Sequence, residues 1–253
     1  AKSKAVNPHQ LIGGLYSPVE MVVDPREAIA TVAIYLHEQL NVKFIWNSKA
    51  TRVRSNKVFF DSRSLEADVV CICSGADFET LYPDHFKQLE ITKCKLQMMR
   101  FKSKAENFNL GPSLCGGLSL IHYKGFTAAP SLAALQKRYY NEMPCYIKNG
   151  IHVMVSQNGQ GELTVGDSHR YGLSLDPFDD AKINALITSY LSQFVTSSNW
   201  QLLQTWNGIY PKMLNGATDI FIQPEDGVYI LNGLGGAGMT LSFGFAEEMV
   251  ENI

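Results

Sequence analysis

The C-terminal stretch DGVYILNGLGGAGMTLSFGFAEEMVENI, residues 226–253, constrains the fold more than any other part of the sequence. Residues 228–231 are a short apolar run with β-branched side chains, which predicts a buried strand. Four glycines follow within the six residues 233–238. Leu241, Phe245 and Met249 then recur at every fourth position, which predicts a helix. The expected order is therefore strand, glycine loop and helix N-terminus.

Such a loop allows a backbone to approach a ligand closely, because glycine has no Cβ and readily adopts positive φ. The helix start adds free N–H groups and the positive end of the helix dipole, which favour an anionic or electron-rich group. Residues 239–242 carry no charged side chain that would occupy this position. Close packing of a helix on a strand requires similar glycines, so a tight turn without a ligand is the alternative explanation.

The composition is that of an ordinary globular protein. The chain has 253 residues, of which 45% are apolar and 18% charged, with a net charge of −2. This length suffices for one large domain or two small ones. The charge predicts no nucleic-acid or membrane-surface partner, and no apolar run approaches the roughly 20 residues that span a bilayer.

The cysteines predict a reducing compartment. There are five of them, an odd number, and we expect reduced thiols in a cytoplasmic protein. Cys71 and Cys73 would face opposite sides of one strand, which makes them poor ligands for a shared metal ion. No metal site is predicted.

Four segments, in this order along the chain, resemble the FAD-dependent oxidoreductases of the D-amino-acid oxidase, glycine oxidase and sarcosine oxidase superfamily. They are SPVEMVVDPREAI at 17–29, ADVVCICSGA at 67–76, WNGIYP at 206–211 and GLGGAGMTLSFGFAEEM at 233–249. Two more, GLSLIHYKGF at 117–126 and VGDSHRYG at 165–172, are similar to a bacterial branch often linked with phosphonate metabolism. The resemblance implies FAD as the cofactor.

The resemblance also implies a fold that combines α/β and α+β parts. A Rossmann-like FAD-binding domain would comprise residues 1–82 and 212–253, and an antiparallel-sheet substrate domain, residues 83–211, would be inserted in it. Family members open with a βαβ unit whose G-x-G-x-x-G holds the FAD pyrophosphate. No such unit opens this chain, so we expect it to correspond to the later part of a longer oxidoreductase.

In the first part of the chain, Asp24-Pro25 predicts a helix start and Glu27 could complete a capping box. We expect this helix to bury a stripe of apolar residues and to be followed by a strand at 42–46. A hairpin is predicted around Ser55-Asn56, and a parallel strand at 69–73. The predicted buried stripe is Ile29, Val32, Ala33, Leu36 and Leu40.

In the middle of the chain, residues 91–101 predict an antiparallel strand that turns Lys93, Lys95 and Gln97 towards solvent. Further strands are predicted at 116–126, 151–156, 162–166 and 200–209. Asp176-Pro177 predicts the start of a helix. The buried stripe of that helix would be Ile183, Leu186, Ile187, Tyr190, Leu191 and Phe194.

On the flavin side, the resemblance implies contacts from Ser74 and Gly75 at a strand end, and from the backbone of Ala50 on the adenine side. The C-terminal loop would face the pyrimidine end of the flavin. Its contacting residues would be Gly235, Gly236, Ala237, Gly238, Met239 and Thr240. For Ala50 and Gly75 the alternative is a strand and a turn that only pack.

On the substrate side, glycine and D-amino-acid oxidases hold the substrate carboxylate with an arginine in a W-x-G-x-R-P segment. Tyr210 occupies that position here, and Gly236 replaces a second arginine of glycine oxidase. A tyrosine offers one hydroxyl and no charge. The resemblance therefore argues against a simple α-amino acid as substrate, with an aminophosphonate as the candidate.

Residues 121–124 are expected to wall the substrate cavity. They belong to the predicted strand at 116–126, in which His122 and Lys124 share one face while Tyr123 takes the other. His122 could accept the amine proton, while Tyr123, Lys124, Tyr210 and His169 contact the substrate. A hydrogen-bonded structural His122, a solvated Lys124 and a polar turn at 167–170 are the alternatives.

The sequence thus supports an FAD-dependent oxidoreductase that oxidises a C–N bond of a small amine or amino-acid-like substrate to an imine. Oxygen or another acceptor would reoxidise the flavin. A dehydrogenase of the same fold that does not use oxygen, and a non-catalytic fragment or subunit without flavin, are the alternatives. Self-association is left open.

Overall fold

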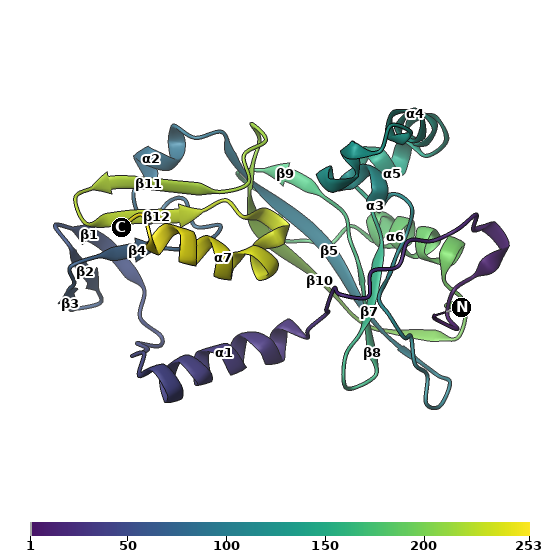
Figure 1. Ribbon diagram of the computed structural model, residues 1–253, viewed down its shortest axis with the longest axis horizontal. Helices are drawn as coiled ribbons and strands as arrows, with labels where there is room; N and C mark the ends of the chain where they lie inside the picture. Colours follow the sequence, from purple (N-terminus) through teal and green to yellow (C-terminus); the bar gives the residue numbers. More distant parts are fainter. Residues whose placement is uncertain (1) are drawn as a thin grey trace. The chain divides into compact units, whose positions relative to one another are not determined.

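The computed structural model describes residues 2–253 and divides into two compact units. The first unit combines the chain up to Val42 with Lys95–Arg170 and Asp176–Gly208. The second unit combines Lys43–Cys94, Tyr171–Leu175 and Ile209–Ile253. Figure 1 labels most helices and strands of both units.

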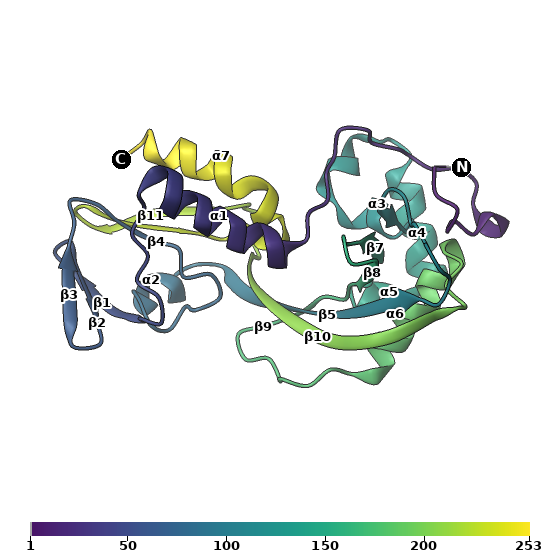
Figure 2. The same ribbon diagram turned by 90° about the horizontal axis from the view of Figure 1, so that it is seen from below.

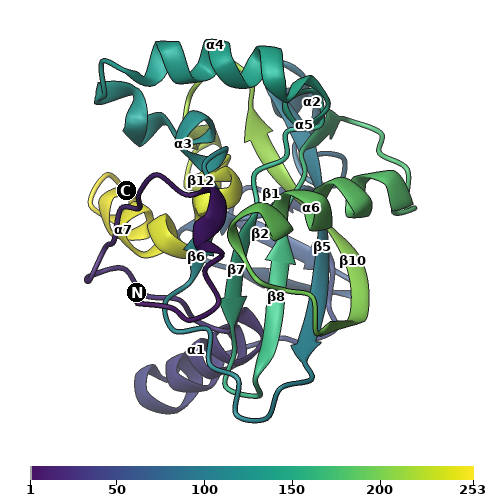
Figure 3. The ribbon, with the colours of Figure 1, turned by 90° about the vertical axis from the view of Figure 1, so that its right-hand side faces the viewer.

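The main sheet of the first unit is antiparallel across its centre. Its order is β10 (Trp200–Met213), β5 (Ile91–Ser103), β8 (Glu162–Gly166), β7 (Met154–Gln157) and β6 (Leu114–Cys115), and β9 (Arg170–Gly172) also pairs with β5. The pairs β5–β8, β7–β8 and β6–β7 are antiparallel. Figure 2 shows β5 and β10 as long, curved neighbours, and Figure 3 shows β7, β8, β5 and β10 side by side.

The core of this unit lies between the sheet and α6 (Ala181–Phe194). Leu163 and Val165 of β8 are fully buried and pack with Ile187 and Leu191 of the helix. The predicted apolar stripe of α6 is confirmed at its centre and end, because the buried residues of the helix are Ile187, Tyr190, Leu191 and Phe194. The predicted strand at 162–166 is confirmed in β8 with the same bounds, and those at 151–156 and 200–209 are confirmed in β7 and β10 with shifted bounds.

The second unit contains two small sheets. One is the meander β1 (Ala50–Arg54), β2 (Lys57–Phe60) and β3 (Arg63–Glu66). The other has the order β11 (Ile220–Glu225), β12 (Val228–Asn232) and β4 (Val70–Ile72), in which β12 runs parallel to β4. Two further helices are α2 (Pro83–Lys87) and α7 (Gly238–Val250).

Three predictions for the second unit are confirmed. The β1–β2 hairpin turns at Ser55 and Asn56, whose φ values of 50° and 59° are those of a tight hairpin turn. The strand at 69–73 appears as β4 and pairs in parallel. The C-terminal stretch forms β12, the short 3-10 turn η3 (Gly235–Ala237) and α7, in the expected order.

None of the described helices has the length and apolar character needed to cross a membrane. The remaining elements are η1 (Pro8–Gln10), α1 (Pro25–Leu40), α3 (Ser119–His122), η2 (Lys124–Ala128), α4 (Leu132–Glu142) and α5 (Pro144–Lys148).

Helix α1 starts as predicted, because the Asp24 side chain accepts a hydrogen bond from Arg26 N at 3.0 Å and Pro25 is the first helical residue. Its predicted burial is wrong. No residue of α1 is buried, and Ile29 and Leu40 are 61% and 58% exposed. A 3.6-residue period shows that a helix has an apolar face, but it does not show that an element of this chain packs against that face.

Three predicted boundaries are also wrong. Residues 42–46 form no strand, and no described strand pairs with them. Residues 116–126 contain α3 and the start of η2 instead of a strand. A Cβ on Gly116 would lie 2.5 Å from Tyr190 Cε1, so the chain turns here directly against the aromatic core. The cap of α6 is Asp180, whose side chain accepts from Lys182 N at 2.8 Å, and not Asp176.

The strand prediction at 91–101 is confirmed in β5, but the facing of its polar residues is wrong. Lys95 and Gln97 are 3% and 6% exposed. Lys95 Nζ donates to the carbonyl of Asp176 at 2.8 Å and also to that of Phe178. Gln97 Nε2 donates to Asn184 Oδ1 at 2.8 Å. These polar side chains are buried because the segment preceding α6 and the helix itself supply partners for them.

Candidate active site

Three histidine rings meet in the first unit. The ring centroids are 3.8 Å apart for His122 and His152, 4.6 Å for His122 and His169, and 5.1 Å for His152 and His169. His122 is the last residue of α3, His152 precedes β7, and His169 lies between β8 and β9. His122 is exposed, while His152 and His169 are buried. We refer to these three residues as the histidine cluster.

Backbone hydrogen bonds fix the two buried rings. Asp167 N donates to the carbonyl of His152 at 3.0 Å, which continues the pairing of β7 with β8. His169 N donates to the carbonyl of Asn149 at 3.0 Å, and its Nδ1 lies 2.9 Å from the carbonyl oxygen of Gly150. A carbonyl only accepts, so His169 carries its proton on Nδ1 and keeps a lone pair on Nε2.

Asp167 lies beneath the cluster, with Oδ1 3.2 Å from His152 Nε2 and 3.7 Å from His169 Nδ1. Burial lowers the pKa of His152 to about 2 and raises the pKa of Asp167 to about 7, since both charged forms lose hydration. The short distance alone would suggest an ion pair. Because burial disfavours both charges, we describe His152 as a neutral ring beside a carboxyl group. His152 Nδ1 is buried and has no hydrogen-bond partner.

Tyr123 adjoins the cluster, and its ring centroid lies 5.0 Å from that of His122 and 5.4 Å from that of His152. Burial, followed by the charge of Asp167, raises the pKa of the Tyr123 hydroxyl to about 12, so it remains a proton donor. Lys124 begins η2 and is exposed. The expectation that His122 and Lys124 share a strand face is wrong, because the chain leaves α3 and enters a 3-10 turn between them.

Arg170, which directly follows His169, does not join the cluster through its charge. Its Nη1 donates to Asp176 Oδ2 at 2.8 Å, and its side chain is 71% exposed. This contact fits the solvated-turn alternative for Arg170.

The second unit holds the predicted flavin-contacting residues. The parallel strands β4 and β12 end side by side, and Asn232 Nδ2 donates to the carbonyl of Gly75 at 2.9 Å across the two ends. Ser74 Oγ is buried there without a hydrogen-bond partner. Gly75 has φ +58, with open space where a Cβ would point. Ligands of α/β sheets bind at such carboxyl ends of parallel strands.

The glycine loop lies between β12 and α7. Gly233 and Gly235 have φ values of 83° and 60°, which favour glycine. Gly233, Gly235 and Gly238 match the G-x-G-x-x-G spacing, without the βαβ unit that defines the motif in this family. Helix α7 begins with no side-chain cap and no acidic residue in its first turn, and Met239 and Thr240 at its start are exposed.

The structure brings together the two positions at which the resembling oxidases carry arginines. A Cβ on Gly236 would lie 3.5 Å from the hydroxyl of Tyr210. Ala50, expected on the adenine side, is the first residue of β1 and pairs with Phe60.

These features fit an electron-rich cofactor. An unpartnered buried hydroxyl, glycines with positive φ and an uncapped, uncharged helix start leave hydrogen-bonding groups for a ligand to satisfy. The groups that could hold the FAD implied by the resemblance are Ser74, the loop after β12 and the first turn of α7.

The family model "DAO: FAD dependent oxidoreductase" matches residues 1–252. The chain belongs to this family. The match agrees with the resemblance inferred from the sequence and supports FAD as the cofactor of the family.

Solved structures share the fold. L-proline dehydrogenase from P. horikoshii superposes with a TM-score of 0.64 at 16% identity, covering 87% of this chain and 52% of that one. Glycine oxidase from Geobacillus kaustophilus gives 0.54 at 16% identity, with coverage of 77% and 45%. Iminodiacetate oxidase from Chelativorans sp. BNC1 gives 0.51 at 14% identity, with coverage of 77% and 46%. The chain spans about half the length of these structures. A search of curated proteins gave no match.

Sequence reasoning missed His152 and Asp167. His152 stands in the apolar run IHVMV, which predicts only a strand, and Asp167 stands in a polar segment that predicts a turn. The signal that could have found them is the pairing of β7 with β8, which places Met154 opposite Gly166 and so brings the residues next to these positions together.

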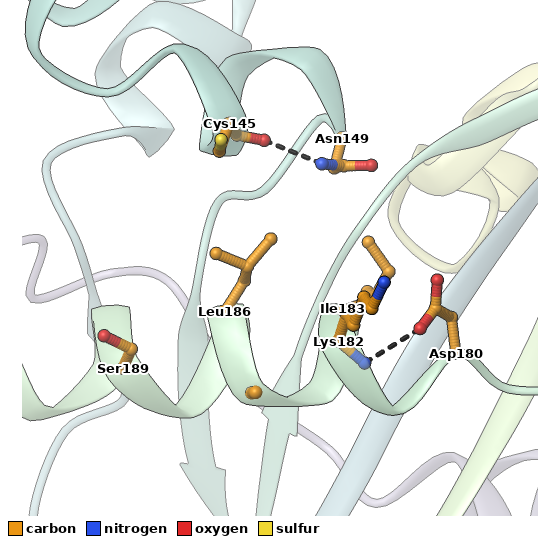
Figure 4. A pocket seen from close by; sticks show the side chains of 8 residues that line it. Cys145, Asn149, Asp180, Lys182, Ile183, Leu186 and Ser189 are labelled. Atoms are coloured by element: carbon orange, nitrogen blue, oxygen red, sulfur yellow. Dashed lines mark hydrogen bonds between the residues drawn. The ribbon is translucent and has the colours of Figure 1, made fainter.

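A separate hollow of about 550 Å³ lies between α5 and α6 (Figure 4). It is open to solvent, and its side chains include Cys145, Asn149, Lys182 and Leu186. Asn149 Nδ2 donates to the carbonyl of Cys145 at 2.8 Å, so this amide is already used within the wall. The hollow contains none of the histidine cluster and no predicted site residue.

Replacement of Gly150 by alanine should disturb the histidine cluster. Gly150 has φ +57, and a Cβ there would lie 2.7 Å from His169 Cβ, so the backbone and the ring must both shift. We expect the free energy of unfolding to fall by about 1–2 kcal/mol from the backbone conformation alone. We also expect changed histidine NMR signals. Gly159→Ala is the matched control, because a Cβ there meets nothing within 4 Å. Unchanged histidine signals in Gly150→Ala would contradict the described packing.

Proposed function

We propose that this protein is an FAD-dependent oxidoreductase that oxidises a C–N bond of a small amine or amino-acid-like substrate to an imine. The observation that carries the proposal is at the adjacent ends of the parallel strands β4 and β12. Ser74 Oγ is buried after β4 without a hydrogen-bond partner, and Asn232, which precedes the glycine loop, donates a hydrogen bond to Gly75 beside it. The family match over residues 1–252 supports the same cofactor.

The proposed flavin-binding segments are residues 1–82 and 212–253, with the substrate side contributed by residues 83–211. The backbone N–H groups at the start of α7 would stabilise negative charge on an electron-rich group, because no capping side chain uses them. When bound, FAD supplies the acceptor for the two electrons removed from the substrate. The proposed cofactor-binding residues are Ala50, Ser74, Gly75, Gly235, Gly236, Ala237, Gly238, Met239 and Thr240.

On the substrate side, His122, the exposed ring of the cluster, would accept the proton of the substrate nitrogen. Tyr123 would donate a hydrogen bond, since its raised pKa of about 12 keeps the hydroxyl protonated. His169 would accept through Nε2, because its Nδ1 is committed to Gly150. Lys124 and Tyr210 are the two further proposed substrate-binding residues.

The proposed substrate class is an aminophosphonate or its N-alkylated relative. Tyr210 and Gly236 stand together where the resembling oxidases have arginines, so this pair offers no charged fork for a carboxylate. Imidazoles and the Lys124 ammonium would instead provide hydrogen bonds and charge to a phosphonate.

The test uses the protein from its complete gene. We expect a yellow preparation whose visible flavin bands bleach under anaerobic mixing with an N-alkylated aminophosphonate. Bleaching by glycine or D-alanine, without any by the aminophosphonate, would contradict the assigned role of Tyr210. A colourless preparation would contradict the flavin assignment and favour a non-catalytic subunit. Peroxide formation in air separates an oxidase from a dehydrogenase that uses another acceptor.

We also propose the cytoplasm as the location and a small molecule as the partner, without nucleic acid or membrane. Cys71, Cys73, Cys115 and Cys145 are free thiols, which is usual in a reducing compartment. Assembly into a homo-oligomer is compatible with this proposal.

A further inference from the structure

We propose that His122, His152 and His169 form a binding site for one divalent transition-metal ion, with Zn²⁺ as the reference ion. The site goes beyond the proposed function, since amine oxidation by a flavin requires no metal. The three ligands come from separate segments of the first unit: His122 ends α3, His152 precedes β7 and His169 follows β8.

The first argument is the spacing of the ligand atoms. One ring nitrogen from each histidine lies within 4.8 Å of the others. Three nitrogens bound to Zn²⁺ at about 2.0–2.1 Å are about 3.3 Å apart in a tetrahedral site. The widest pair must therefore close by roughly 1.5 Å, the difference between these two spacings. His122 is exposed at the end of the four-residue helix α3, so it is the ring that can make this movement.

The second argument is the state of the two buried rings. His152 is 2% exposed, and its Nδ1 has no hydrogen-bond partner, although a buried polar atom normally has one. A metal ion would satisfy this lone pair, while Nε2 on the other side of the ring faces Asp167 at 3.2 Å.

The third argument is the set of groups behind the ligands. Metal-binding histidines usually direct their second nitrogen to a carboxylate or a backbone carbonyl, which fixes the ring and its tautomer. His169 Nδ1 has the Gly150 carbonyl at 2.9 Å, and His152 has the Asp167 carboxyl. His169 thus has a hydrogen-bonded supporting partner, whereas Asp167 Oδ1 lies beside His152 Nε2 without a hydrogen bond and would form one when the metal fixes the ring.

Three histidines leave the fourth position of a tetrahedral ion open, as in catalytic rather than structural zinc sites. Water or an anion would occupy it. A ring nitrogen bound to a metal cannot accept a proton, so metal binding and proton transfer by His122 exclude each other. Zn²⁺ should therefore inhibit amine oxidation, and this one consequence rests on the proposed function.

The test is a titration of the chelator-treated protein from its complete gene. Calorimetry with Zn²⁺ should show one ion per chain, and Co²⁺ should give visible d–d absorption typical of nitrogen ligands. His122→Ala should weaken binding at least roughly 10-fold, and Asp167→Asn by about 10- to 100-fold, the usual range for a supporting partner. His9→Ala, an exposed histidine outside the cluster, should bind as the wild type does.

Absence of binding to the wild-type protein would overturn the proposal. Equal affinity in His122→Ala would do the same, and so would a thiolate-to-metal charge-transfer band with Co²⁺, because both would place the ion elsewhere. The titration needs neither flavin nor substrate. Its failure is therefore distinguishable from failure of the proposed oxidation, which is measured by anaerobic bleaching without added metal.

Discussion

Replacing Gly235 with valine in the protein from its complete gene should abolish flavin binding. Gly235 has φ +60, a conformation that costs an L-residue about 1–2 kcal/mol and a β-branched one more. A Cβ would make only ordinary van der Waals contacts, 3.6 Å from Lys212 Cδ and 3.7 Å from the carbonyl oxygen of Pro211, so the effect comes from the backbone conformation. The loop would then turn away from the conformation that leaves the α7 N-terminus open. The measurement is the ratio of flavin to protein absorbance, with a melting curve to show that the variant is folded.

Gly244→Ala is the control, because it lies within α7 and a Cβ there meets nothing within 4 Å. Alanine is favoured over glycine in a helix by about 1 kcal/mol, so this variant should keep its flavin and melt no earlier than the wild type. If Gly235→Val does not fold, Gly235→Ala, which has the same φ constraint and a smaller side chain, replaces it. A full complement of flavin in the folded Gly235 variant would rule out this loop as part of the binding site.

Leu191→Ala should lower the free energy of unfolding of the first unit by about 2–5 kcal/mol, the range for a buried leucine. Leu191 is 1% exposed and packs in the core between α6 and the sheet, where removal of its side chain leaves a cavity. Urea unfolding followed by circular dichroism measures the change.

Leu202→Ala provides the comparison, because Leu202 lies on β10 and is 48% exposed. Its expected change is within about 1 kcal/mol. Equal losses in the two variants would mean that the α6 face is not the packed face.

Elements whose signals are local could be predicted from the sequence. The α6 stripe follows a 3.6-residue period, and Ser55-Asn56 is a turn pair with tolerance for positive φ. The order of β12, glycine loop and α7 follows from an apolar run, glycines and a second period. In each case the pattern and the structure depend on the same few consecutive residues.

Features that depend on distant partners could not be predicted. The burial of Lys95 depends on carbonyls of the chain before α6. The exposure of α1 depends on whether another element packs against its apolar face. The histidine cluster depends on the pairing of β7 with β8 and on α3, a segment whose sequence predicts a strand. Local pattern contains no information on such contacts.

The enclosed ammonium of Lys95 has a chemical consequence. Its side chain is 4% exposed, and Nζ is held by the carbonyls of Asp176 and Phe178. Acylating reagents and acetyltransferases need a deprotonated, accessible amine, so they would modify surface lysines such as Lys49 and Lys87, at 68% and 73% exposure, well before this one. Modification at Lys95 would accordingly record a moment at which the segment before α6 had lifted from β5.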